Sequence, residues 1–360
     1  MQKTMKAAVV SEFGAPLRID ELPVPTPGAG ELLVEVMACG VCHTDLHAAE
    51  GDWPVKPAPP FVPGHETAGR VVGIGPNVDG YKIGDAVGIA WLHDACGKCE
   101  YCITGWETLC PSQRNSGYSV NGGFAQYAIA SAAYAGRLPG DVDFASIAPI
   151  ICAGVTTYKG IKETQAQPGQ WIAISGLGGL GHIAVQYAKA MGLRVIGLDI
   201  AADKLALARS LGADATFDAN SPDAIAQVID ATGGGAHGVL VTAVSRPAFS
   251  QALQYVRRGG TVALNGLPPG DFPTPIFDVV LKRITIRGSI VGTRYDLSQA
   301  IAFAVQGKVK ANIHTAALDD VNDVFDQLKA GKVDGRVVLD LTKARTQTTR
   351  SHADDRYATV

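Results

Sequence analysis

The chain of 360 residues predicts a two-domain α/β protein, in which a doubly wound parallel sheet is inserted between the two parts of a β-rich domain. Three observations support this prediction. The length suits about two domains of roughly 150 residues each. Strand-like and helix-like segments alternate between positions 170 and 291, and short strand-like runs separated by Pro and Gly precede that region. Alternation of this kind places helices on both faces of a parallel sheet.

The expected elements follow from hydrophobic periodicity and turn residues. In the first third, short strands are expected at 5–10, 31–38, 69–75 and 85–91, separated by turn residues such as Pro23, Pro25, Pro27, Gly28 and Gly30. In the middle, strands are expected at 171–175, 194–200, 237–244, 261–266 and 285–291, with helices at 178–191, 201–211 and 247–257. Two amphipathic helices, 296–306 and 319–330, and a strand, 336–341, complete the fold.

These elements set the expected domain boundaries. Residues 1–152 and 293–343 are expected to form the β-rich catalytic domain, with a separate lobe at about 92–113. Residues 153–292 are expected to form the nucleotide-binding domain, reached through the apolar stretch 145–162, which is plausibly helical on both sides of Pro149. Residues 344–360 are polar and lack an apolar period, which predicts a frayed tail.

The composition excludes several classes of protein. Hydrophobic residues make up 47% of the chain and charged residues 18%, which is too apolar for an intrinsically disordered protein. The 31 Lys and Arg residues against 34 Asp and Glu residues leave no basic excess for nucleic acid. The longest stretch without charged residues, 164–188, contains five glycines, and no signal sequence is evident. We therefore expect no nucleic-acid partner, no membrane insertion and a cytoplasmic location.

Four clustered cysteines predict a structural metal site. Cys96, Cys99, Cys102 and Cys110 follow the spacing C-x2-C-x2-C-x7-C. Two-residue gaps let neighbouring thiolates converge on one ion, and the longer loop lets the fourth complete a tetrahedron around zinc without a free position for substrate. The alternatives are an iron–sulfur cluster, whose usual run has a three-residue last gap, and cysteines that bind no metal.

A glycine-rich turn predicts a dinucleotide site. Gly176, Gly178 and Gly181, with Gly179 between them, form G-x-G-x-x-G after an expected strand and at the start of an expected helix. Gly176 permits the tight turn, Gly178 lets the backbone approach a pyrophosphate, and Gly181 permits close packing of helix and strand. The helix N-terminus supplies free N–H groups for the phosphates.

An acidic residue after the next strand favours NAD over NADP. Asp199 lies twenty-three positions after Gly176, where a carboxylate can accept hydrogen bonds from both adenosine ribose hydroxyls and repels a 2′-phosphate. Alternatively, Asp199 only caps the following helix. Lys204, one turn further on, either supports the ribose or is a solvated helical lysine.

Reactive side chains gather at three separate places in the sequence. Residues 40–47, Gly-Val-Cys-His-Thr-Asp-Leu-His, place a thiol, two imidazoles, a hydroxyl and a carboxylate close together. Gly64-His65-Glu66 adds an imidazole beside a carboxylate, and Cys152 lies alone in an apolar stretch. Spacing does not connect the three places, and taken alone it makes Cys152 a buried core thiol.

Together, residues 40–47 and 64–66, the four-cysteine lobe and the glycine turn resemble the zinc-dependent medium-chain alcohol dehydrogenases, most closely the bacterial and yeast-type ethanol dehydrogenases. The resemblance runs from about Met5 to Lys343. It implies a Rossmann domain and a GroES-like catalytic domain. The implied activity is reversible NAD-dependent oxidation of a small primary alcohol to the aldehyde.

The resemblance implies a ligand set for a catalytic zinc. Cys42, His65 and Cys152 would bind the ion, with water or alcohol in the fourth position, and the ion would lower the pKa of the alcohol hydroxyl. Glu66 would approach the metal during ligand exchange, and Asp45 would hold the other ring nitrogen of His65. With the cysteine lobe, two zinc ions per chain are expected.

The resemblance also implies a proton path and cofactor contacts. Thr44 would accept the hydroxyl proton and pass it through the nicotinamide ribose to His47, which would deliver it to solvent. His43 and Arg336 would contact the pyrophosphate. From the residues alone, His43 could equally be a surface histidine at a helix start, and Arg336 an edge charge of the last strand.

Trp53 and Trp91 match aromatic positions that narrow the substrate pocket in yeast-like members, which favours short aliphatic alcohols, although either could belong to the core. Cys39, which forms C-x2-C with Cys42, is interpreted as a core residue, and His93 has no assigned role. The resemblance implies a homotetramer whose sheets join edge to edge through residues 285–291.

Two other functions remain open. One is another medium-chain dehydrogenase, of the cinnamyl or benzyl, polyol or formaldehyde type. The other is a catalytically silent relative that keeps only nucleotide binding. The presence of Cys42, Thr44, His47, His65 and Cys152 argues against the silent relative, because such a chain is expected to lose a ligand or relay group.

Overall fold

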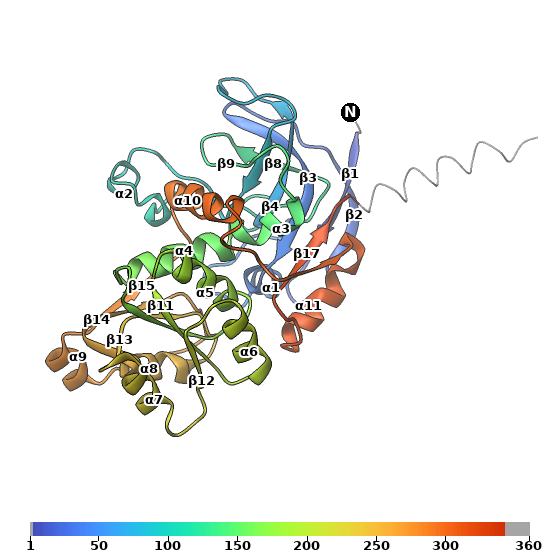
Figure 1. Cartoon of the computed structure of the whole chain (residues 1–360). Coiled ribbons are helices and arrows are strands. Elements are labelled where there is room, and N and C mark those ends of the chain that lie inside the picture. Colours follow the sequence, from blue (N-terminus) through green and yellow to red (C-terminus); the bar gives the residue numbers. More distant parts are fainter. Residues whose placement is uncertain (1–2, 343–360) are drawn as a thin grey trace, which may run out of the picture. The chain divides into compact units, whose positions relative to one another are not determined.

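The computed structural model describes residues 3–342, which divide into two compact units (Figure 1). The first unit combines the chain up to Cys152 with the chain from Asn312 onward, and the second runs from Ala153 to Ala311. The predicted polar tail, residues 344–360, lies outside the described residues. No single helix in residues 3–342 is long and apolar enough to cross a membrane, although one bent pair, Phe144–Ile151 with Ala153–Glu163, meets the length and composition together.

The first unit is built around a mixed sheet with the strand order β16-β17-β3-β4-β5-β9, onto which β8 pairs through β3. Two short antiparallel pairs, β1 with β2 and β6 with β7, complete its strands. The strands are β1 (Thr4–Val9), β2 (Arg18–Pro23), β3 (Glu31–Val41), β4 (Glu66–Ile74), β5 (Ala86–Ile89), β6 (Leu92–Asp94), β7 (Arg114–Asn115), β8 (Tyr127–Ser131), β9 (Gly136–Arg137), β16 (Ile313–Ala316) and β17 (Arg336–Asp340).

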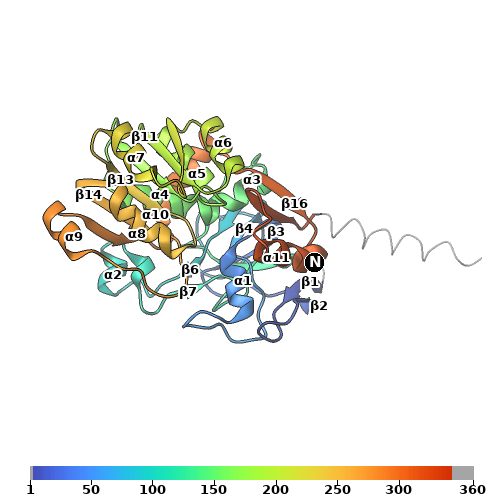
Figure 2. The same cartoon turned by 90° about the horizontal axis from the view of Figure 1, so that it is seen from below.

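Helices of the first unit are short and lie mostly at the ends of strands. They are α1 (His43–Glu50), α2 (Glu100–Ile103), α3 (Phe144–Ile147), α11 (Val321–Lys329) and the 3-10 turns η1 (Glu107–Leu109), η2 (Ala148–Ile151) and η3 (Leu318–Asp320). Helix α11 lies beside the N-terminal hairpin in both views (Figures 1 and 2), where Asn322 exchanges hydrogen bonds of 2.8 and 3.0 Å with the backbone of Leu17. The two ends of the chain thus share one core.

The second unit confirms the predicted doubly wound sheet. Its six strands are all parallel, in the order β12-β11-β10-β13-β14-β15, and Figure 1 shows α4 and α5 on one face with α7 and α8 on the other. The strands are β10 (Trp171–Ser175), β11 (Arg194–Asp199), β12 (Ala215–Asp218), β13 (Ala236–Val241), β14 (Val256–Leu264) and β15 (Thr285–Gly288). The helices are α4 (Ala153–Glu163), α5 (Gly181–Ala190), α6 (Ala202–Ser210), α7 (Ala224–Thr232), α8 (Arg246–Tyr255), α9 (Ile276–Lys282) and α10 (Arg294–Val305).

The central strands are apolar throughout because both faces are covered. Every residue of β10 is buried, and so are the inner residues of β11 and β13. Continuous apolar strands of this kind are typical of parallel sheets between two helical layers. This burial explains why the sequence pattern located these strands well.

The boundary after the second unit differs from the one expected. The sequence analysis assigned residues 293–311 to the catalytic domain, whereas the structure groups them with the second unit. The reason is the packing of α10 on α4 and α5: the Tyr187 hydroxyl donates to the Ala300 carbonyl at 2.9 Å, and Lys162 Nζ donates to Asp296 Oδ1 at 2.7 Å. These hydrogen bonds, one of them buried, therefore hold α10 against the rest of the second unit.

Candidate active site

The first element of the site is the start of α1. Strand β3 ends at Val41 and delivers Cys42 to the N-cap position of the helix. The backbone N–H of Cys42 donates to Asp45 Oδ2 at 2.9 Å, and the N–H of Asp45 donates to the Cys42 carbonyl at 3.0 Å. This reciprocal capping fixes Cys42 at the end of the sheet.

Asp45 also holds His65. The Nδ1–H of His65 donates to Asp45 Oδ1 at 2.8 Å, and the N–H of Gly64 donates to the same oxygen at 3.0 Å. With Nδ1 engaged, the lone pair of the imidazole lies on Nε2, which is buried and has no partner among the described residues. A buried carboxylate that holds one nitrogen and leaves the other free is the usual arrangement around a metal-binding histidine.

The structure brings four side chains together from distant segments. The ligand atoms of Cys42, His65, Glu66 and Cys152 all lie within 4.8 Å of one another, and all four residues are buried. Cys152 lies between η2 and α4, at a break in the helical path. Two thiols, an unpartnered imidazole nitrogen and an adjacent carboxylate fit a zinc ion. This cluster is a candidate metal site.

The surroundings of the cluster favour ionisation of one of its two thiols, that of Cys42. A hydrogen bond from the Cys152 thiol, together with the nearby charge of Arg336, holds the pKa of Cys42 well below its ordinary value although burial opposes it. The thiolate is the form that binds metal. Cys42 is therefore poised to supply an anionic ligand.

Arg336 and Glu66 form a buried ion pair beside the cluster. The guanidinium of Arg336 donates through Nη2 to Glu66 Oε1, while Glu66 Oε2 has no partner in residues 3–342. Burial raises the pKa of Glu66 to about 7, even though the charge of Arg336 lowers it. Arg336 is not at a sheet edge, because β17 lies between β16 and β3. The structure thus places this arginine inside the site.

Aromatic rings surround the two histidines. The ring of Trp91 meets that of His65 edge-on at 5.4 Å, and the ring of Trp53 stacks on that of His47 at 5.3 Å. Tyr118 connects the two indoles, with centroid distances of 5.3 Å to Trp91 and 6.2 Å to Trp53. The sequence analysis did not identify Tyr118, because a single tyrosine in a turn-rich segment carries no spacing signal.

The relay candidates lie on α1. His47 Nδ1 is 3.0 Å from Asp52 Oδ2, Thr44 is half-buried and His43 is exposed. Asp52 was not identified either, although it follows Gly51, which ends α1 in the left-handed conformation and turns the chain back toward His47. A carboxylate on Nδ1 leaves Nε2 of His47 free to accept a proton.

The four-cysteine lobe forms a second candidate metal site. The sulfurs of Cys96, Cys99, Cys102 and Cys110 all lie within 4.8 Å of one another. The N–H of Cys99 donates to Cys96 Sγ at 3.4 Å, and backbone N–H donors of Lys98 and Cys99 lower the pKa of Cys96 to about 6. All four cysteines are free of disulfides. Four converging thiols fit a closed structural zinc site.

The glycine turn of the second unit has the geometry that its motif predicts. Gly176 has a φ of +94°, and a Cβ on Gly181 would come within 1.9 Å of the Gly176 carbonyl oxygen. A side chain at either position is therefore excluded, whereas a Cβ on Gly178 would meet nothing within 4 Å. The turn leaves open space above Gly178, as close approach of a phosphate requires.

Asp199 stabilises this turn as well as the next helix. Its Oδ2 accepts the Leu177 N–H at 2.7 Å, and its Oδ1 accepts the N–H groups of Ile200 and Ala201 at 2.8 and 3.1 Å. Asp199 thus caps the segment before α6, as one of the two interpretations expected, and its carboxylate also orients the glycine turn. Lys204 lies half-buried in the first turn of α6.

Comparisons with known proteins agree with this geometry. The family model described as "Alcohol dehydrogenase GroES-like domain" matches residues 28–140, and the one described as "Zinc-binding dehydrogenase" matches residues 179–306. An alcohol dehydrogenase of Moraxella sp. (strain TAE123) is 59% identical over 338 residues, covering 94% of this chain and 100% of that protein. An alcohol dehydrogenase of Rhizobium meliloti (strain 1021) is also 59% identical over 338 residues, covering 94% of this chain and 99% of that protein.

Solved structures are similar over the same length. The alcohol dehydrogenase of Aeropyrum pernix superimposes with a TM-score of 0.86 at 35% identity, covering 93% of this chain and 100% of that one. Acetophenone reductase of Geotrichum candidum, solved in complex with NAD, gives a TM-score of 0.84 at 31% identity, covering 95% of this chain and 98% of that one. The chain belongs to the zinc-binding medium-chain alcohol dehydrogenases.

Proposed function

We propose that this chain is an NAD-dependent alcohol dehydrogenase that reversibly oxidises small primary alcohols to aldehydes, with one catalytic and one structural zinc ion. The observation that carries the proposal is the unpartnered Nε2 of His65, buried within 4.8 Å of the ligand atoms of Cys42, Glu66 and Cys152. When bound, zinc supplies a Lewis acid for the alcohol oxygen and NAD supplies the hydride acceptor.

The residues of the chain supply position and proton transfer. Asp45 orients both Cys42 and His65, so one carboxylate fixes two candidate ligands. Thr44 begins the proposed proton path, and His47, held by Asp52 at 3.0 Å, ends it. A histidine with its second nitrogen free suits transfer of a proton to solvent. Glu66, charge-paired with Arg336, is proposed to approach the metal during ligand exchange, and Arg336 and His43 to contact the pyrophosphate.

Asp199 and the glycine turn support NAD as the cofactor. A buried carboxylate directly behind the turn disfavours the extra phosphate of NADP, because like charges would meet in a partly desolvated place. Acetophenone reductase, a similar structure, was solved with NAD bound. We propose the same preference for this chain.

The aromatic group of Trp53, Trp91 and Tyr118 supports a small substrate. These rings lie against the two histidines of the site, with Trp91 in contact with His65 itself. Large rigid rings leave room for short chains and exclude bulky ones. We therefore favour short aliphatic alcohols over cinnamyl alcohols or polyols.

The proposed setting is a homotetramer in the cytoplasm. Reduced cysteines are needed at both candidate metal sites, which suits a compartment that keeps thiols reduced. Strand β15 is the last strand of its sheet, and Ile276, Phe277, Val280 and Leu281 of α9 are between 67% and 81% exposed. An unpaired edge beside an apolar helix face supports association of sheets between copies.

Initial rates with NAD and NADP across a series of alcohols, combined with metal analysis, test the proposal. We expect two zinc ions per chain and a preference for NAD and for short primary alcohols. Asp199→Asn keeps an acceptor for the backbone while removing the charge, and it should narrow the preference for NAD by about 1–3 kcal/mol. A preference for NADP would overturn the proposed cofactor. A preference for cinnamyl alcohol over ethanol would overturn the proposed substrate class.

A further inference from the structure

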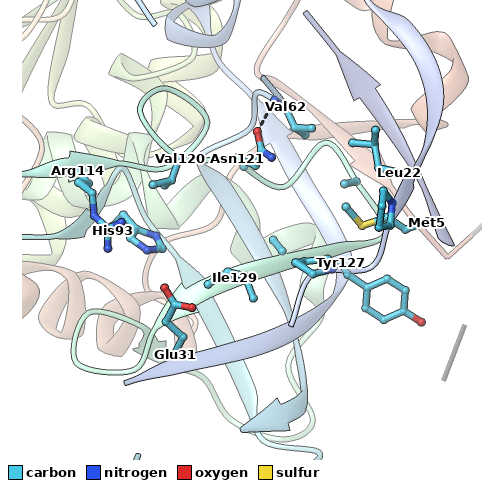
Figure 3. A pocket seen from close by; sticks show the side chains of 15 residues that line it. Met5, Leu22, Glu31, Val62, His93, Arg114, Val120, Asn121, Tyr127 and Ile129 are labelled. Carbon is cyan, nitrogen blue, oxygen red and sulfur yellow. Dashed lines mark hydrogen bonds between the residues drawn. The ribbon is translucent and has the colours of Figure 1, made fainter. Parts of the chain in front are cut away.

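A cavity of about 470 Å³ opens in the first unit (Figure 3). None of its fifteen lining residues is among the eight candidate metal ligands. Its walls come from β1, β2, β3, β6, β7 and β8 and from the turn 120–122. The floor is buried, whereas Arg114, Asn121 and Pro23 are exposed at the rim. The cavity is therefore accessible from solvent and large enough for a small organic molecule.

Polar side chains gather at one end of the cavity. Figure 3 shows Arg114, His93 and Glu31 together there, with the carboxylate of Glu31 directed toward the ring of His93. His93 is only 3% exposed, and its Nδ1 has no hydrogen-bond partner among the described residues. Burial lowers the pKa of His93, so the ring is neutral at pH 7. A buried, unpaired ring nitrogen in a cavity wall is costly unless a ligand or water satisfies it.

The charge at this end is negative. Arg114 Nε donates to both oxygens of Asp94, at 3.0 and 3.1 Å, so these two charges compensate each other. Glu31 Oε2 accepts the N–H of Gly28 at 2.8 Å, and the carboxylate also lies near enough to Arg114 for their charges to interact. The carboxylates of Glu31 and Asp94 outnumber the single guanidinium of Arg114, so this end carries one excess negative charge, and the unpartnered Nδ1 of the neutral His93 adds a hydrogen-bond acceptor.

The other end of the cavity is apolar. Figure 3 shows Met5, Leu22 and Val62 there, and Val120 and Ile129 along the sides, while the hydroxyl of Tyr127 points away from them. A straight alkyl chain would bury its methylene groups against this wall, at about 0.8 kcal/mol for each buried group. One end of the cavity is therefore polar and the other apolar, which matches the two ends of an amphipathic ligand.

We propose that this cavity is a binding site for a small primary amine, whose ammonium group lies between Glu31 and His93 and whose aliphatic tail lies against Met5, Leu22 and Val62. An ammonium group donates three hydrogen bonds and neutralises the carboxylate. A hydroxyl donates only one, and a carboxylate would be repelled by Glu31. The inference does not depend on the proposed catalytic function.

The test is the binding of n-hexylamine to the zinc-loaded full chain by isothermal titration calorimetry, with 1-hexanol and hexanoate as ligands matched in tail. We expect hexylamine to bind with a Kd of about a millimolar, as suits so small a ligand. Glu31→Gln retains an oxygen for the Gly28 N–H and should weaken binding about tenfold. Ala128→Leu fills the cavity and should weaken it as well.

Two control variants separate the cavity from other sites. Glu21→Gln removes an exposed carboxylate on β2 that does not line the cavity, and it should leave hexylamine binding unchanged. Cys42→Ser removes a candidate metal ligand and should also leave it unchanged, since an amine that binds at the metal would be lost in this variant. If Ala128→Leu does not fold, Glu31→Gln and the series of head groups carry the test.

Three results would overturn the proposal. The first is the absence of hexylamine binding to the wild-type chain. The second is binding that Glu31→Gln leaves unchanged or that Cys42→Ser abolishes. The third is hexanoate binding as tight as that of hexylamine, which would contradict the negative character of the polar end.

Discussion

The two candidate metal sites of the first unit differ in how their ligands are brought together. The lobe takes Cys96, Cys99, Cys102 and Cys110 from one short segment, and three of these residues are only half-buried. The other cluster takes its ligands from the ends of β3, η2 and the turn before β4, and all of them are buried. One site follows from local spacing, and the other exists only when the whole unit is folded.

The two sites also differ in the charged side chains that surround their candidate ligands. In the lobe, the thiols receive backbone N–H groups, and no charged side chain completes the set of ligands. Around the buried cluster, Asp45, Glu66 and Arg336 add two carboxylates and a guanidinium within the core. Burying such groups costs desolvation free energy even when they are paired, so this second arrangement indicates chemistry rather than stability. The lobe instead contributes metal-binding energy to folding.

The largest effect that separates the two sites is expected from Cys42→Ser. Loss of a thiolate ligand should remove the metal from the buried cluster and lower alcohol oxidation by about 10³-fold or more, while the lobe keeps its metal. Metal analysis should then give one zinc ion per chain, with nucleotide binding still measurable. Unchanged turnover would refute the assignment of Cys42 as a ligand.

In the lobe, Cys102→Ser should lower stability and leave turnover nearly unchanged, the reverse of what is expected for Cys42→Ser. Without a complete set of thiolates, the lobe loses metal-binding energy, which we expect to cost about 3 kcal/mol of stability, or roughly 10 °C in Tm. Turnover at low temperature should change little, and Ser112→Ala, an exposed position in the same lobe, should leave Tm unaltered. A collapse of activity at unchanged Tm would show that the lobe has a catalytic role.

Asp45→Asn is expected to have an intermediate effect. The amide still accepts one hydrogen bond, but it loses the charge that orients His65 and Cys42, which should lower zinc affinity or activity about 10–100-fold. Competition with a chelator measures this affinity. The exposed Asp79→Asn serves as the matched control. Equal zinc affinity in both variants would mean that Asp45 supports only the start of the helix.

The same contrast explains how much of the molecule the sequence predicts. Cysteine spacing predicts the lobe because four ligands within one loop have few ways to meet. Strand β10, which is wholly buried, and β13, which is buried except at His237, are predicted for a similar reason, since continuous apolar runs follow directly from burial on both faces. Strand β12 was not predicted, because it is short and lies at a sheet edge, where only Thr216 of its four residues is buried.

The buried cluster could not be derived from spacing. Cys42, His65 and Cys152 are adjacent only through the pairing of β3 with β4 and the break of the helix at Cys152, so only the resemblance to a family connected them. Tyr118 and Asp52 were not identified, since each acts through a neighbouring ring or imidazole rather than through a motif. Helix α10 was assigned to the wrong side of a boundary, because its amphipathic pattern does not tell which unit it covers.

A substitution of Cys39 is expected to have the smallest effect, and it tests directly whether local spacing or convergence of distant segments defines the buried metal site. It forms C-x2-C with Cys42, the same local spacing as in the lobe, yet the structure does not place it in either cluster of candidate ligands. Its thiol lies 3.4 Å from Thr67 Oγ1, and burial, followed by the charge of Asp45, raises its pKa well above the ordinary value. The position of Cys39 outside both groups of converging ligand atoms, rather than its sequence spacing, therefore separates it from the candidate metal ligands.

Cys39→Ala should therefore leave both metals and the turnover number intact and cost only about 1 kcal/mol of stability for a small cavity in the core. Metal analysis and denaturant unfolding of the variant measure the two quantities. The Cys42→Ser variant, only three residues away in the sequence, is the comparison, because it is expected to lose one zinc ion. Loss of a zinc ion from Cys39→Ala would show that local spacing, and not the convergence of distant segments, defines the second site as well.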